Sequence, residues 1–137
     1  DVVSSHEGRV VKLIGDEVLF VVDTLDQAIA AGLDLIARLA EVDDMPAVHC
    51  GVAFGPTITV GGDVFGPTVN LASRLTKVAR PGSIAVPRKG NESVLDRDDL
   101  DVRKVRRTYD LKGIGRTSIL AVRALPDASA DQESQRD

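Results

Sequence analysis

Aromatic residues, cysteine and long apolar runs are scarce in this sequence of 137 residues, and each scarcity excludes a class of protein. Aromatic side chains make up 3% of the chain, so base stacking along single-stranded nucleic acid is not expected. Cys50 is the single cysteine, which excludes an internal disulfide and favours a reducing, cytoplasmic setting. No apolar run approaches the roughly 18 residues of a membrane-spanning helix. We therefore expect no membrane segment in this chain.

A strong positive charge is also absent. The formal net charge is −4, so the broad basic surface that binds DNA or RNA is not expected. A small polyanionic ligand remains compatible with this charge if lysine and arginine gather locally. Hydrophobic residues make up 43% and charged residues 28%, which is ordinary for a globular domain of this length.

The first apolar segments predict a β-hairpin. Residues 9–14 and 17–22 are rich in β-branched side chains, and Gly15-Asp16 between them is a common two-residue turn. Both strands carry apolar residues on both faces, so we expect both to be buried.

Helices are expected over residues 24–40 and 69–79. Thr24 and Gln27 fit a capping box at the first, and Gly66-Pro67 precedes the second. Strands alternate with these helices, and tight hairpins are present, which favours an α+β sandwich with a mixed, mainly antiparallel sheet. The further strands are expected at 47–54, 57–60, 83–86, 102–108 and 118–122. Residues 126–137 lack apolar periodicity and predict a disordered tail after a domain of residues 1–125.

Two polar residues stand out in the predicted hairpin. Lys12 interrupts an apolar strand, where a buried charge is costly unless it is paired. An edge-strand lysine that extends its amine to solvent is the alternative. Asp16 at the turn could hold a hard metal ion that bridges phosphate oxygens, or it could serve the turn alone. The hairpin by itself leaves both pairs of alternatives open.

Four further residues are candidates for a ligand site. Asn70 and Arg74 are four residues apart on the predicted helix and share a face, although a solvated helix face explains this spacing equally well. Asp63 precedes this helix and could be a loop residue. Lys112 is followed by Gly113, which lets backbone approach a phosphate, but this is a weak signal and no Walker loop is present.

Taken together, three segments of the chain resemble the class III adenylate/guanylate cyclase catalytic domain. They are VKLIGD at residues 11–16, DVFGPTVNLASR at 63–74 and LKG at 111–113. Their order and the intervening lengths also agree, and the resemblance covers about residues 8–123. It implies a ferredoxin-like, palm-type fold and cyclisation of a nucleoside triphosphate with two Mg²⁺ or Mn²⁺ ions per site.

The resemblance also implies a role for each candidate residue. Asp16 matches the second of two metal-binding aspartates. Lys12 and Asp63 match the pair that reads adenine, which favours ATP over GTP as substrate.

On the predicted helix and the later loop, Asn70 matches the residue that orients the ribose, Arg74 the one that stabilises the transition state, and Lys112 a triphosphate ligand. The family forms head-to-tail homodimers, in which each site takes its metal ligands from one subunit and its base, ribose and phosphate contacts from the other. The expected partners are therefore ATP and a second copy of the chain.

One expected element is missing from the sequence. The family's first metal aspartate lies on an earlier strand in a Phe-x-Asp motif, and residues 1–9 contain no such motif. We therefore expect a domain that lacks its first strand, with little cyclase activity in this chain alone and activity in the intact protein. The alternatives are a catalytically silent domain that binds nucleotide or dimerises, and a guanylate or diguanylate-type cyclase, which Gly15-Asp16-Glu17 resembles.

Overall fold

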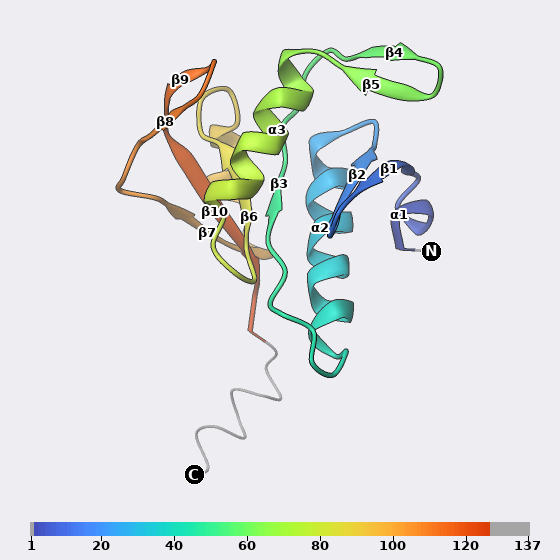
Figure 1. The fold of residues 1–137 in the computed structure, drawn as a ribbon. Helices are drawn as coiled ribbons and strands as arrows, with labels where there is room; N and C mark the ends of the chain where they lie inside the picture. Colours follow the sequence, from blue (N-terminus) through green and yellow to red (C-terminus); the bar gives the residue numbers. More distant parts are fainter. Residues whose placement is uncertain (1, 127–137) are drawn as a thin grey trace.

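The fold is built around one four-stranded sheet (Figure 1). The structure, a computed structural model, describes residues 2–126. The strand order is β3-β6-β10-β7, with β10 antiparallel to both β6 and β7, and β3 parallel to β6. The bounds are Cys50–Gly51 for β3, Ile84–Pro87 for β6, Leu100–Lys104 for β7 and Ile119–Ala124 for β10. The sheet is mixed and mainly antiparallel, as predicted.

Two helices, α2 and α3, pack against opposite faces of this sheet. Their bounds are Leu25–Ala40 and Pro67–Val78. Ile29 of α2 packs in one apolar cluster with Ile84, and Leu75 of α3 packs in another with Ala85. Ile84 and Ala85 are neighbours on β6, and successive strand residues point to opposite faces. The sheet therefore separates two apolar clusters, and the α+β prediction is confirmed.

The start of α2 follows from its local sequence. The Thr24 hydroxyl accepts a hydrogen bond from the Gln27 backbone N–H at 3.1 Å, and the Gln27 side chain accepts one from the Thr24 N–H at 3.0 Å. These two bonds satisfy N–H groups that a helix start leaves without partners. The predicted capping box is confirmed, and the helix ends at Ala40 as expected.

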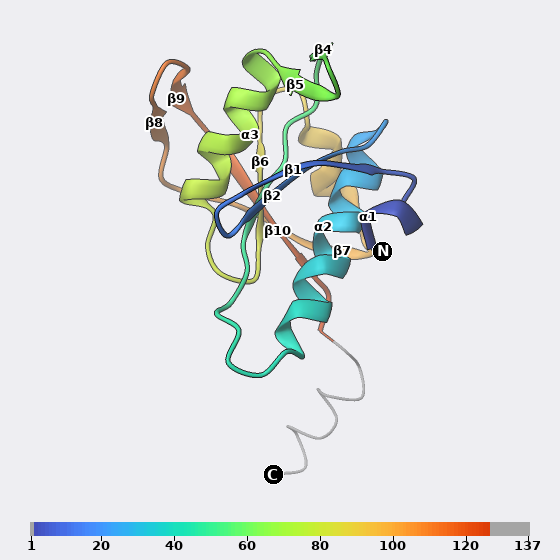
Figure 2. The same cartoon turned by 45° about the vertical axis from the view of Figure 1, so that its right-hand side comes forward.

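Three hairpins form two-stranded sheets of their own, apart from the central sheet. They are β1 (Arg9–Ile14) with β2 (Glu17–Val21), β4 (Ile58–Val60) with β5 (Asp63–Phe65), and β8 (Tyr109–Leu111) with β9 (Gly115–Thr117). Two short helical segments are α1 (Val2–Ser5) and the 3-10 helix η1 (Glu92–Asp96). Figures 1 and 2 show the β1–β2 hairpin on the same side of the molecule as α1 and α2.

The first hairpin forms where the sequence predicts it, but the expectation that both of its strands are buried is wrong. Leu13 is 72% exposed, and Ile14 and Val18 are also exposed. Apolar residues on both faces of a strand do not distinguish burial in the chain's own core from exposure at a surface. The β1–β2 hairpin instead presents apolar side chains at the surface of this chain.

The strand predicted over residues 47–54 is reduced to Cys50–Gly51. Helix α3 packs directly on this backbone. The approach is so close that a Cβ at Gly51 would collide with backbone atoms of Ala72 and Thr76. The Gly51 N–H donates to the Thr76 hydroxyl at 3.1 Å, so a helix side chain replaces a strand as its partner. On this edge of β3 the neighbour of Gly51 is therefore a helix and not a second strand.

Two expectations from the sequence concern a membrane segment and the C-terminal tail. Within residues 2–126, no helix combines the length and apolar character needed to cross a membrane. The disordered tail predicted for 126–137 lies, apart from Pro126, outside the described residues.

Candidate active site

Lys12 and Asp63, 51 residues apart in sequence, form an ion pair between β1 and β5. The Lys12 Nζ donates to the Asp63 Oδ2 at 2.9 Å, and the side chains are 40% and 32% exposed. The Phe65 ring lies beside the same amine, with its centroid 6.0 Å from Nζ. The structure therefore favours a paired lysine over an edge-strand lysine directed only to solvent.

The Asp63 carboxylate is held as an anion by two donors. The hydrogen bond from Lys12 is the larger cause and that from the Val64 backbone N–H, at 2.7 Å, the second, and together they lower the pKa of Asp63 below its usual 3.8. An ammonium donor thus lies next to a fixed carboxylate acceptor. Such a pair can recognise a ring that presents an acceptor beside a donor.

Asp16 lies in the tight turn of the β1–β2 hairpin. Ile14 pairs with Glu17, and Gly15 adopts a φ of 58°, so Gly15-Asp16 is the predicted two-residue turn. The Asp16 side chain is exposed. Among the described residues, no group of three or more His, Cys, Asp or Glu side chains is placed to hold a metal.

A single carboxylate still fits one kind of metal site. Mg²⁺ keeps several waters and is commonly held by one or two carboxylates together with the phosphates of a substrate. Asp16 supplies one such carboxylate, the smaller of these two numbers.

A cleft of about 810 Å³ brings three of the six predicted site residues together. Lys12, Asp16 and Asn70 all line it, between the β1–β2 hairpin, α2, the segment around β3 and the first half of α3. Most of the other lining side chains are apolar. Asp63 borders this group through its bond to Lys12 but does not line the cleft itself.

Arg74 and Lys112 lie outside that cleft. Leu75 and Leu111, their immediate neighbours, pack in one apolar cluster, so α3 and the β8–β9 hairpin lie side by side and carry the two cations. Within residues 2–126, neither cation forms an ion pair with an acidic side chain. Both charges are therefore available to an anion.

One bulge and one contact at the site have no signal in the sequence. β1 contains a bulge between Val10 and Lys12, and Arg9 donates to the Gly62 carbonyl at 3.0 Å. A bulge depends on strand pairing, and no pattern in residues 9–14 marks it.

Comparison with known proteins identifies the family of this chain. The model of the adenylate and guanylate cyclase catalytic domain matches residues 1–123. An adenylate cyclase of Streptomyces coelicolor is 45% identical over 86 residues, which cover 63% of this chain and 23% of that protein. The chain belongs to the adenylate and guanylate cyclase catalytic domain family, and it spans less than a quarter of the length of this relative.

Solved structures show the same fold. A cyclase from Silicibacter pomeroyi has a TM-score of 0.71 and 24% identity, covering 93% of this chain and 78% of that one. The catalytic core of a rhodopsin-guanylyl cyclase with converted specificity, solved with ATPαS, has a TM-score of 0.73 and 21% identity, covering 90% and 74%. The predicted palm-type cyclase fold is confirmed.

Proposed function

We propose that this domain catalyses the conversion of ATP to 3′,5′-cyclic AMP and pyrophosphate. The Lys12–Asp63 pair is the observation that carries the proposal. Adenine presents a ring nitrogen acceptor beside an exocyclic amine donor, which matches an ammonium beside a carboxylate. Relatives named adenylate cyclase, including the one from Streptomyces coelicolor, also support ATP as the substrate.

In the proposed reaction the ribose 3′-hydroxyl attacks the α-phosphate of the same molecule. A new O–P bond forms, the bond to the β-phosphate bridging oxygen breaks, and pyrophosphate and the hydroxyl proton leave. Asn70 would orient the ribose, which lowers the entropic barrier to ring closure. Arg74 would stabilise charge on the phosphorus oxygens, and Lys112 would bind the triphosphate.

Asp16 would hold a divalent ion, Mg²⁺ or Mn²⁺. Such an ion makes the attacking hydroxyl more acidic and offsets phosphate charge. The resemblance assigns a second ion to a further aspartate on an earlier strand, and residues 2–126 contain no group of three or more His, Cys, Asp or Glu side chains placed to hold a metal. For this reason we expect little activity from the 137-residue chain alone.

The site is proposed to form between two copies arranged head to tail. Two observations support this: Arg74 and Lys112 lie outside the cleft that Asp16 lines, and exposed Leu13, Ile14 and Val18 surround that turn. Lys12 and Asn70, which line the cleft together with Asp16, would serve the second site of the same dimer. Exposed apolar groups of this kind indicate a protein contact. In the dimer, Asp16 of one protomer would meet Arg74 of the other.

A complementation assay tests the shared site. In the full-length protein, Asp16→Ala and Arg74→Ala should each reduce cyclic AMP formation from ATP at least roughly a hundredfold, the size expected for a lost transition-state contact. Mixed subunits should recover activity to about a quarter of wild type, because half of the dimers carry one intact site. No recovery, with both variants still dimeric by light scattering, would contradict the shared site.

Two alternatives have support of their own. Guanine also offers an acceptor beside a donor, so GTP must be assayed beside ATP. A catalytically silent domain that binds nucleotide would keep the Lys12–Asp63 pair and lack the metal-dependent reaction. ATP binding by calorimetry without cyclic AMP release from the full-length protein would establish that reading and exclude the cyclase.

A further inference from the structure

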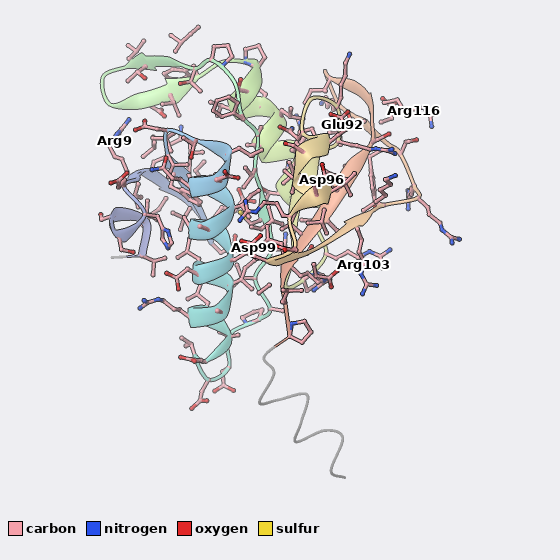
Figure 3. The ribbon with its side chains drawn as sticks, turned by 180° about the vertical axis from the view of Figure 1, so that it is seen from behind. Arg9, Glu92, Asp96, Asp99, Arg103 and Arg116 are labelled. Carbon is pink, nitrogen blue, oxygen red and sulfur yellow. The ribbon has the colours of Figure 1, made fainter. Side chains whose placement is uncertain are left out.

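We propose that Arg9 is a positioning residue for nucleotide selectivity, which holds Asp63 opposite Lys12 while a base occupies the site. This inference rests on the proposed function. Arg9 begins β1, and its Nη1 donates to the Gly62 carbonyl at 3.0 Å, across 53 residues of sequence. Gly62 immediately precedes Asp63. Figure 3 shows Arg9 extending from β1 towards the β4–β5 hairpin.

The bulge in β1 explains why Arg9 and Lys12 contact the same hairpin. Val10 pairs with Phe20 and Lys12 with Leu19, so Val11 is an extra residue without a partner. In a regular strand, side chains three positions apart point to opposite faces. The extra residue changes this alternation, and such bulges often direct side chains at functional sites.

The β4–β5 hairpin needs an anchor of this kind. It is a separate two-stranded sheet, and an isolated hairpin is marginally stable in water. Ile58 and Val60 are more than 60% exposed, while Val64 is buried and anchors one side of β5. Within residues 2–126, only the bonds from Arg9 and Lys12 connect side chains of the body to residues 58–65 by hydrogen bonding.

Base recognition would remove one of these two connections. Lys12 and Asp63 cannot keep their full mutual bond while each bonds to a base, because the base takes the donor of one and the acceptor of the other. The Arg9–Gly62 bond does not involve the base-reading atoms, so it can persist in the complex. It would then keep β5 at its distance from β1 and preserve the spacing between the Lys12 donor and the Asp63 acceptor, on which the proposed preference for adenine depends.

The test compares Arg9→Ala with Arg123→Ala in the full-length protein. Arg123 is a matched control, since its Nη1 also donates to a backbone carbonyl, that of Pro81, at 3.2 Å and away from the site. Arg9→Ala should raise the KM for ATP and lower the ATP over GTP ratio of kcat/KM, each roughly fivefold, the size of one hydrogen bond, with kcat within about twofold. Arg9→Lys, which keeps one donor, should recover part of the selectivity. Arg123→Ala should change neither quantity.

Hydrogen exchange separates this inference from the proposed function. Amides of residues 58–65 should exchange faster in Arg9→Ala than in Arg123→Ala, with the larger difference when a non-hydrolysable ATP analogue is bound. Unchanged KM, selectivity and exchange in Arg9→Ala would overturn the role of Arg9 while leaving the cyclase proposal intact. If the wild-type protein binds no nucleotide, the cyclase proposal and the selectivity role of Arg9 both fail, whatever the exchange of residues 58–65 shows.

Discussion

The central sheet and the two hairpins that carry Lys12, Asp16 and Asp63 differ sharply in burial. All four residues of β6 are buried between the two helices, whereas all three residues of β4 are exposed. The β1–β2 hairpin is likewise buried at most in part. Stability is thus concentrated in the sheet, and the proposed base and metal contacts lie on weakly anchored elements, which can adjust to a ligand.

Truncation of a leucine should show the difference most clearly. Leu120 on β10 is fully buried in the cluster beneath α2. Leu120→Ala should lower the free energy of unfolding by about 2–5 kcal/mol, since it removes buried contacts and leaves a cavity. Urea denaturation measures the change.

Leu13→Ala on the exposed hairpin is the matched control. It should change the unfolding free energy by less than about 0.5 kcal/mol. Comparable losses in the two variants would contradict the contrast between sheet and hairpin. If Leu13→Ala weakened the dimer but left the unfolding free energy of the monomer unchanged, the hairpin would be a contact surface and not part of the core.

The contact of β3 with α3 should give the next largest effect. Gly51→Ala places a methyl group against backbone atoms of Ala72 and Thr76, which cannot move aside as a side chain can. We expect a loss of about 1–3 kcal/mol in unfolding free energy. At Gly55 the added carbon would meet only the side chain of Thr68, so Gly55→Ala should cost clearly less. Thermal unfolding of both variants compares them, and equal losses would argue against direct backbone packing.

The smallest effect is expected from the cluster that ties the first residues to α2. His6 Nε2 lies 3.1 Å from the Asp34 carboxylate, and Arg38 donates to it at 3.0 Å. The hydrogen bond with His6, and then that with Arg38, lower the pKa of Asp34 below its usual 3.8. Asp34 therefore stabilises the fold above about pH 4, and this contribution is lost as pH falls through its lower, folded-state pKa.

Asp34→Asn should remove this pH dependence. Because the side chains are partly exposed, the wild type should exceed the variant by at most about 1 kcal/mol at pH 6, and the difference should shrink near pH 3. Urea unfolding at both pH values provides the measurement. A difference that grows towards acid would have the wrong sign for a carboxylate with a lowered pKa.

Local patterns predicted elements well where neighbouring residues decide the conformation. The Gly15-Asp16 turn and the Thr24 capping box depend on side chains within three positions of each other, and both appear as predicted. β5 was not expected as a strand, because Asp63–Phe65 pairs only with an equally short neighbour across Gly61-Gly62. The strand predicted at 57–60 appears as β4, but the three residues of β5 are too few to show an alternating pattern by themselves.

The sequence alone determined the class of fold, the bounds of α2, and the residue types whose order resembles a nucleotide cyclase, since these depend on local spacing and composition. Tertiary structure decided that Lys12 pairs with Asp63, that Arg9 contacts Gly62, and that Arg74 and Lys112 lie outside the cleft of Asp16. It also decided that the first hairpin is exposed. The Lys12–Asp63 and Arg9–Gly62 contacts join segments about 50 residues apart in sequence. Only the packing of helices and strands brings such segments together.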